Sequence, residues 1–164
     1  MKIHDCSYCA VARLCLPLTT KDFPAKGLDN ILHQKTKIKK GQLLISRRTR
    51  FNSFFAVKSG SFKSYLITED GREQISAFYY AGELIGFDAV ESGYYNNNLQ
   101  ALSDSWVCEI SYNKLIKASA SNISLRQHLI KLMSQRINFD NCIRPNTQST
   151  GKLASFLLNF IARM

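Results

Sequence analysis

A chain of 164 residues with an apolar share of 45% is long enough to form one domain with a hydrophobic core, and its formal net charge is +10. It contains no run of about twenty apolar residues, which excludes a membrane-spanning helix, and its first residues lack the apolar stretch of a secretory signal. We therefore expect a cytoplasmic protein, in which five cysteines indicate metal or redox chemistry and not a disulfide framework.

The first fifteen residues hold three cysteines, Cys6, Cys9 and Cys15, and a fourth, Cys108, follows far downstream. Thiolates are soft ligands, and four of them complete a tetrahedral zinc site or hold an iron–sulfur cluster. Two cysteines separated by two residues can grip one centre, whereas Cys108 must be delivered by the folded body of the chain. The spacing therefore predicts a metal centre that ties the N-terminal segment to a domain.

After this segment, Leu28, Ile31 and Leu32 are spaced as in a short helix, and from Lys37 the hydrophobic pattern changes to a period of two. The expected strands are residues 42–46, 54–58, 61–68, 73–80, 98–103 and 106–111. Glycine-containing turns separate them, and Asp70-Gly71 between two alternating runs indicates a hairpin. Short, evenly spaced strands with turn signals predict a β-sandwich or β-barrel body.

From about residue 122 to residue 144 the chain lacks glycine and proline and is rich in helix formers, which predicts one long helix. Successive a and d heptad positions are occupied by Ile130, Met133, Ile137 and Asp140. Such a seam suits either a two-helix coiled coil or one helix lying on the β body. Because a carboxylate on a buried seam is destabilising beside its twin, Asp140 favours a dimer whose strength is tuned.

Pro145 ends this helix, and apolar residues then recur at helical spacing over residues 153–161. The chain stops at Met164, directly on this amphipathic helix, so we expect it to be cut short. The basic residues between Lys35 and Arg50 lie among strand-like residues and form no helical face that could enter a DNA groove. Charge alone therefore gives little support for nucleic-acid binding by this stretch.

No sequence pattern predicts catalysis. The chain has no glycine-rich phosphate loop, nucleophile elbow or H-E-x-x-H motif, and the sequence places no histidine to activate Cys15 as a nucleophile. Glu83 and Asp88 fall in an expected turn, where carboxylates usually cap backbone amides. We expect that the protein is not an enzyme.

The cysteines, residues 82–88, the strand 107–110 and the helix 125–140 together resemble one family. It is the FNR-type (fumarate and nitrate reduction) oxygen-sensing regulators, in the superfamily of the cyclic-AMP receptor protein. The resemblance covers essentially the whole chain, and the cysteine spacing matches the enteric form without insertion. It implies an α+β fold: a β-roll (a double-stranded β-helix of the cyclic-nucleotide-binding type) followed by a long dimerisation helix.

The resemblance also implies a domain organisation. Residues 1–19 would be the cysteine-rich cluster-binding segment, 20–118 the β-roll sensor domain, 119–145 the dimerisation helix, and 146–164 a linker and the first helix of a DNA-binding domain. Only the leading helix of the family's helix-turn-helix is present. DNA is therefore expected as a partner only through a part missing from this chain.

In the family, four cysteines bind a [4Fe–4S] cluster, and here they correspond to Cys6, Cys9, Cys15 and Cys108. Oxygen converts the cluster to a [2Fe–2S] form, the homodimer dissociates and DNA affinity falls. Asp140 corresponds to the helix carboxylate that keeps the apo form monomeric, and Ile137 corresponds to the apolar contact that opposes it.

The resemblance also implies roles for Leu14 and for one hairpin tip. Leu14 matches the residue that shields the cluster from oxygen. Asp70, Gly71 and Arg72 match the hairpin tip that touches RNA polymerase, although Arg72 replaces an acidic residue. Cys142 has no counterpart among the ligands, and we expect it to be an unligated thiol.

Two alternatives stay open. Zinc could bind the four thiolates, with His4 as a possible substitute ligand, although structural zinc sites usually use a second close pair of cysteines. A cyclic-nucleotide-type regulatory domain without redox sensing shares the β-roll, and Gly82-Glu83-Leu84 fits part of its motif. That class, however, clamps the cyclic phosphate with an Arg-Ser or Arg-Thr pair. Tyr95 and Asn96 stand at that place here, so we expect no cyclic nucleotide.

Overall fold

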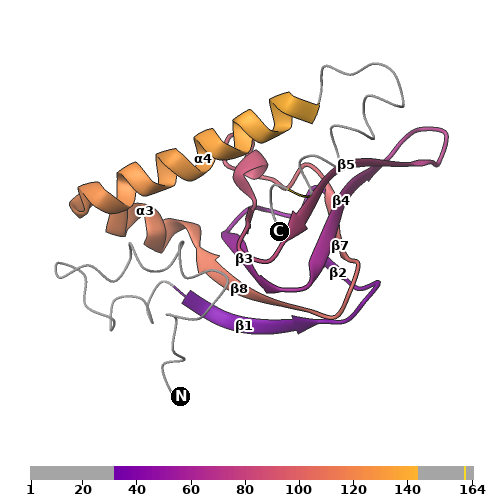
Figure 1. The fold of residues 1–164 in the computed structure, drawn as a ribbon, viewed down its shortest axis with the longest axis horizontal. Helices are drawn as coiled ribbons and strands as arrows, with labels where there is room; N and C mark the ends of the chain where they lie inside the picture. The colour runs from indigo at the N-terminus through magenta and orange to yellow at the C-terminus, as the bar shows by residue number, and fades with distance from the viewer. Residues whose placement is uncertain (1–31, 144–160, 162–164) are drawn as a thin grey trace. The chain divides into compact units, whose positions relative to one another are not determined.

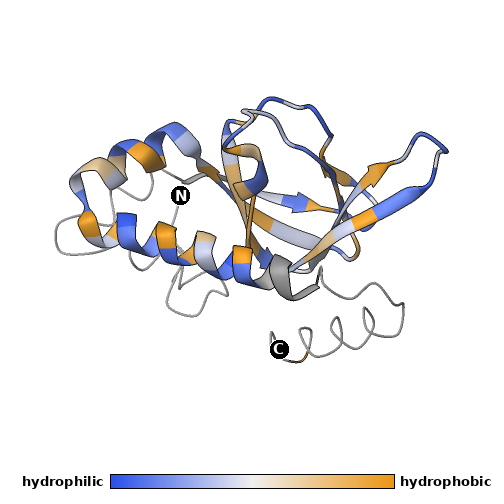
Figure 2. Ribbon diagram, turned by 90° about the horizontal axis from the view of Figure 1, so that it is seen from above, coloured by the Kyte–Doolittle hydropathy of each residue, from blue (hydrophilic) through white to orange (hydrophobic). Residues whose placement is uncertain are grey.

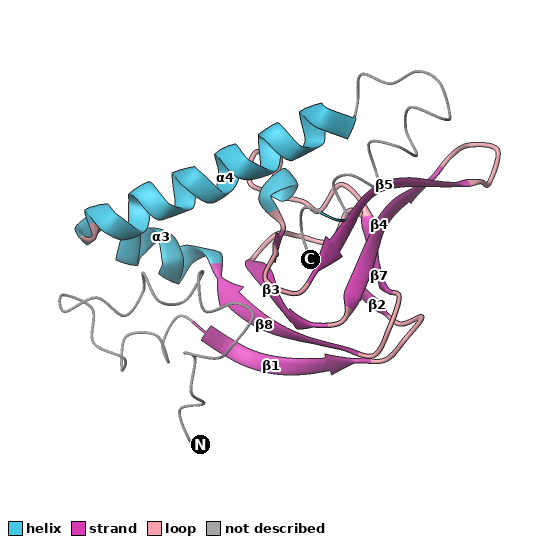
Figure 3. Ribbon diagram, in the orientation of Figure 1, coloured by secondary structure: helices cyan, strands magenta, loops and turns pink. Residues whose placement is uncertain are grey.

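A computed structural model describes residues 32–143 and residue 161 (Figure 1). The chain forms two compact units, Met1–Leu125 and Arg126–Met164. The described part of the first unit contains two antiparallel four-stranded sheets and the helix α3, Tyr112–Ser121. The second unit contains most of α4, Ile123–Ile143 (Figure 3).

The first sheet has the strand order β1-β8-β3-β6. These strands are β1 Leu32–Ile38, β8 Ser105–Ser111, β3 Ser53–Ser59 and β6 Leu84–Ile85. The second sheet has the order β2-β7-β4-β5. Its strands are β2 Leu43–Ile45, β7 Asn98–Ala101, β4 Ser61–Ile67 and β5 Glu73–Tyr80. The side chains of Val57, Val107 and Phe62 come from both sheets and are fully buried, so the core lies between the sheets.

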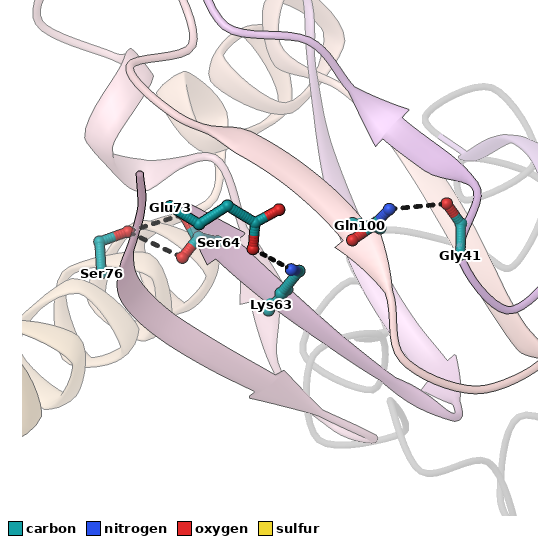
Figure 4. A network of polar contacts seen from close by, with 6 residues as sticks. All are labelled: Gly41, Lys63, Ser64, Glu73, Ser76 and Gln100. Atoms are coloured by element: carbon teal, nitrogen blue, oxygen red, sulfur yellow. Dashed lines mark hydrogen bonds and ion pairs between the residues drawn. The ribbon is translucent and has the colours of Figure 1, made fainter. Parts of the chain in front are cut away.

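Side-chain hydrogen bonds and an ion pair supplement the backbone hydrogen bonds of the second sheet (Figure 4). Lys63 of β4 forms an ion pair with Glu73 of β5, and the Ser76 hydroxyl donates to Ser64 Oγ over 3.0 Å. The Gln100 side-chain amide donates to the carbonyl oxygen of Gly41 over 2.8 Å. These bonds cross between neighbouring chain segments and help to fix the strand register.

The hairpin between β4 and β5 has the predicted tip. The Gly71 amide donates to the Thr68 carbonyl over 2.9 Å, and Gly71 has φ +80°, which a side chain would disfavour. Figure 2 shows hydrophilic residues at this tip. The Asp70-Gly71 signal therefore identified a real turn.

Two features of the structure differ from the prediction made from the sequence: the conformation of Leu32 and the presence of α3. Leu32 begins β1 and pairs with Ile110 of β8, so its helical spacing with residues 28 and 31 was misleading. The helix α3 was not predicted. It is separated from α4 by Asn122, whose extended backbone ends α3 and whose Oδ1 accepts the Leu125 amide over 2.9 Å as the N-cap of α4.

The architecture confirms the predicted fold class, an α+β arrangement in which a β-roll of two antiparallel sheets is followed by helices. Across the residues that the structure describes, no helix is long and apolar enough to cross a membrane.

Candidate metal centre around Cys108

Cys108 lies near the middle of β8, which is an inner strand of the first sheet. It is directly opposite Lys35 of β1 on one side and Ala56 of β3 on the other. Residues that face each other across an antiparallel ladder share one side of the sheet. The side chains of Lys35, Cys108 and Ala56 therefore form one row across three strands.

The register shows which side of the sheet this row occupies. Val57 and Val107 are opposite each other, and the next pair on their side, Phe55 and Glu109, lines a pocket with Ile45 of the second sheet, so this side faces the core between the sheets. Side chains alternate along a strand, so Ala56 and Cys108 point to the outer side. Cys108 is only 6% exposed there, and Ala56 is fully buried. Of the four predicted ligands, the structure thus places Cys108 as a buried thiol on the outer side of the first sheet.

The same outer side carries an aromatic cluster at the start of α3. Phe54 of β3, opposite Ile110, contacts Tyr112 and Phe51 with ring centroids 5.9 and 5.2 Å apart. The Tyr112 amide also donates to the Asn52 carbonyl over 3.0 Å. Burial of these rings fixes the point where β8 passes into α3, directly after the strand that carries Cys108.

The other predicted cluster residues, Cys6, Cys9, Cys15 and Leu14, lie outside the described residues. Within residues 32–143 and 161 there is no group of three or more histidine, cysteine or acidic residues that could hold a metal ion. The chemistry of the donor set fits a cluster, because four thiolates are its usual ligands. The methyl group of Ala56 is also a small neighbour for Cys108.

The predicted dimer seam lies on α4. Ile130, Met133 and Ile137 are 61%, 40% and 57% exposed, and Figure 2 shows apolar and polar positions alternating along the helix. Asp140 belongs to α4, but its side chain lies outside the described part, as does that of Cys142. Large apolar side chains left exposed at heptad spacing are typical of a surface that a partner covers.

The hairpin tip predicted to contact polymerase is accessible. Arg72 Nε lies 3.0 Å from Asp70 Oδ2, and both side chains are more than half exposed. The Thr68 hydroxyl also bonds to the Asp70 carboxylate. The three tip residues 70–72 therefore present one opposite-charge pair on a turn.

The segment compared with a phosphate clamp has other roles in this structure. Glu83 Oε2 accepts the Tyr80 amide over 3.0 Å, which is the turn-capping role expected for it. Tyr95 is buried, and its hydroxyl donates to the Ser53 carbonyl over 2.5 Å. The Asn96 side chain donates to the Asp88 carbonyl over 2.7 Å. Neither Tyr95 nor Asn96 can supply the cationic clamp of a cyclic phosphate.

Burial raises the pKa of the Tyr95 phenol far above its usual range. The hydrogen bond with the Ser53 backbone lowers this pKa in part, and the nearby carboxylates of Glu109 and Asp88 raise it further. The folded state therefore retains this proton more strongly than the unfolded state. Its stabilising contribution is fully present below the unfolded pKa of about 10 and is lost as the pH rises above that value.

We expect Tyr95→Phe to lower the free energy of unfolding by about 0.5–1.5 kcal/mol at pH 8, because the Ser53 carbonyl loses its donor. The variant should also lose less stability than the parent between pH 8 and pH 10.5. Urea unfolding of both proteins at the two pH values measures this. An equal loss in both proteins would show that Tyr95 does not contribute to the alkaline transition.

The Ser53 hydroxyl donates to Glu109 Oε1 over 2.7 Å between β3 and β8, a bond that was not predicted from the sequence. The available signal was a carboxylate at position 109, in a run from Val107 to Ile110 that is otherwise apolar. This pair lies on the opposite side of the sheet from Cys108.

The fold and the comparisons together define the class of protein. The family model for the cyclic nucleotide-binding domain matches residues 35–122, and the chain belongs to this family. Among solved structures, FixK2 from Bradyrhizobium japonicum superposes with a TM-score of 0.67 at 20% identity, covering 80% of this chain and 67% of that one. The sensor domain of the transcriptional regulator DNR from Pseudomonas aeruginosa superposes at 0.63 with 18% identity, covering 83% of this chain and 90% of that one.

Sequence comparison gives a more specific relationship. The chain is 40% identical over 164 residues to the fumarate and nitrate reduction regulatory protein of Escherichia coli (strain K12). The match covers 98% of this chain and 65% of the relative, so the chain spans less than two thirds of the length of that protein. The resemblance to the FNR-type proteins is thereby confirmed. The relative is a regulatory protein by name, in agreement with the prediction that the chain is not an enzyme.

Proposed function

We propose that this chain is the sensor and dimerisation part of an oxygen-responsive, iron–sulfur transcription regulator of the cytoplasm. The observation that carries the proposal is the pairing of a four-cysteine spacing with the buried, outward-facing position of Cys108. The 40% identity to a fumarate and nitrate reduction regulatory protein supports it. We assign Cys6, Cys9, Cys15 and Cys108 as ligands of a [4Fe–4S] cluster, which when bound supplies an oxygen-labile centre.

The chain offers a direct covalent route from Cys108 to the proposed dimer helix. β8 ends at Ser111, α3 begins at Tyr112, and only Asn122 separates α3 from α4. The aromatic cluster around Tyr112 and the cap by Asn122 make both junctions well defined. A shift of β8 at Cys108 would therefore move the start of α3, and through it α4.

In the proposed regulator, α4 forms a homodimer through Ile130, Met133 and Ile137, and Asp140 opposes association. The exposure of the three apolar side chains supports this assignment. Leu14 would limit oxygen access to the cluster, and Asp70, Gly71 and Arg72 would contact RNA polymerase. DNA recognition would require the helix-turn-helix of the longer relatives, and no cyclic nucleotide takes part.

We expect Asp140→Ala to strengthen dimerisation of the cluster-free chain about tenfold, or ~1.4 kcal/mol, because a like-charge pair on the seam is removed. Sedimentation velocity over a concentration series measures the change. Asp104→Ala is the control, since it removes one carboxylate from an exposed loop of the first unit. An unchanged monomer–dimer balance in the Asp140 variant would remove this residue from the proposed mechanism.

The proposed function is tested by anaerobic reconstitution with iron and sulfide, followed by metal quantitation and visible absorbance before and after air. We expect about four irons per chain and a visible band that air bleaches. A colourless protein with about one zinc per chain, indifferent to air, would contradict the proposal and indicate a zinc-stabilised domain.

A further inference from the structure

A pocket of about 320 Å³ lies between β2 of the second sheet and β3 and β8 of the first sheet. Its lining combines apolar, acidic and basic groups, among them Ile45, Arg50, Ser53, Phe55, Tyr95 and Glu109. All of these residues belong to the first unit. The volume is at the small end of the range of about 300–1,000 Å³ that is usual for ligand pockets.

The acidic group of this pocket is Glu109. Its carboxylate accepts the Ser53 hydroxyl over 2.7 Å, and the Ser53 carbonyl in turn accepts the Tyr95 hydroxyl over 2.5 Å. A carboxylate has about four acceptor sites, so most of its capacity is left after this bond. Glu109 takes no part in the ion pairs that join Lys63 to Glu73 and Arg72 to Asp70.

A half-buried carboxylate gains from a cationic partner more than an exposed one does, because water screens the interaction less. Ser53 and Tyr95 hold the Glu109 side of the pocket in place through side-chain and backbone hydrogen bonds. Buried Ile45 and the Phe55 ring supply apolar wall. This part of the pocket is suited to an ammonium group with a short apolar body.

The basic group of the pocket is Arg50, on the segment between β2 and β3. This segment is fixed by backbone hydrogen bonds: the Tyr95 amide donates to the Thr49 carbonyl over 3.0 Å, and the Arg48 amide donates to the Tyr95 carbonyl over 2.8 Å. The backbone of Arg50 also forms an isolated antiparallel β-bridge with that of Tyr94. Arg48 has φ +65°, a strained value for a residue with a side chain, and such strain is often found at binding sites.

One pocket therefore offers a carboxylate, a guanidinium and an apolar wall. We propose that it binds a small zwitterion of amino-acid size, with the ligand's ammonium group at Glu109 and its carboxylate at Arg50. The carboxylate of Glu109 would repel a phosphate, so the ligand class differs from cyclic nucleotides. The site is also separate from the proposed metal centre, because Glu109 and Cys108 point to opposite sides of the first sheet.

The test is an NMR titration of the ¹⁵N-labelled chain with glycine, 4-aminobutyrate and 6-aminohexanoate. Butylamine and butyrate are the single-charge controls. We expect saturable shifts of the Ser53, Tyr95 and Glu109 amides with at least one zwitterion, and binding at least tenfold weaker for both controls. Glu109→Gln should weaken binding at least tenfold, whereas Glu73→Gln, on the β5 strand, should leave it unchanged.

Arg50→Gln is a second variant that changes a side chain and leaves the backbone bonds of its segment available. It too should weaken binding at least tenfold. The proposal is overturned if no zwitterion gives saturable shifts, if butylamine or butyrate binds as tightly as the best zwitterion, or if both variants retain the parent affinity. None of these outcomes depends on a cluster, so the metal-centre proposal is tested separately.

Discussion

Serine in place of Cys108 should reduce iron incorporation from about four atoms per chain to less than one, with loss of the visible band. A serine hydroxyl is a poor substitute for a thiolate, and the structure places this one ligand on β8, an inner strand of the first sheet. Iron and sulfide analysis after anaerobic reconstitution gives the result. A variant that still assembles a full cluster would disprove the ligand assignment.

Cys142→Ser is the matched control, because it removes a thiol that has no place in the proposed ligand set. It should retain the full iron content. Cys108 is buried, so the serine variant must also be shown to fold, by circular dichroism and thermal unfolding. Cys6→Ser provides a second ligand variant outside the β-roll strands, and the same loss of iron is expected.

The second large effect concerns the fold. Gly60→Ala should lower the free energy of unfolding by about 2–5 kcal/mol, a large part of the 5–15 kcal/mol that is usual for a domain. Gly60 joins β3 to β4 with φ +86°, and a Cβ there would lie 2.0 Å from Ser105 Oγ and 2.8 Å from Ser105 Cα. The positive φ costs roughly 1–2 kcal/mol and the overpacking roughly 1–3 kcal/mol.

Ser105 cannot easily give way, because it is fully buried and its hydroxyl donates to the Ser103 carbonyl over 2.8 Å. Gly41→Ala is the control: Gly41 has φ +82°, but a Cβ there would meet nothing within 4 Å. Urea unfolding of both variants separates the backbone cost from the steric cost. Equal destabilisation by the two substitutions would show that Ser105 moves aside.

Local patterns were enough for most of the strands. The hairpin strands expected at 61–68 and 73–80 are Ser61–Ile67 and Glu73–Tyr80, because period-two patterning and the Asp70-Gly71 turn act over neighbouring residues. Leu32 was placed wrongly since its helical spacing is overridden by pairing with Ile110, a residue far along the chain. α3 was missed because it is only ten residues long and includes an asparagine and two serines, which are weak helix formers; packing on β3 and β8 stabilises it.

By itself, the sequence determined the class of this protein: the cysteine spacing, the strand punctuation and the long helix ending near residue 143 are local or compositional features. The tertiary structure alone decided on which side of the sheet Cys108 lies, and that Arg50, Tyr95 and Glu109 share one pocket. Those facts depend on strand register, and a shift of one residue would turn every side chain to the opposite side. For β1, β3 and β8 the register is set by pairing between segments that are far apart in the chain.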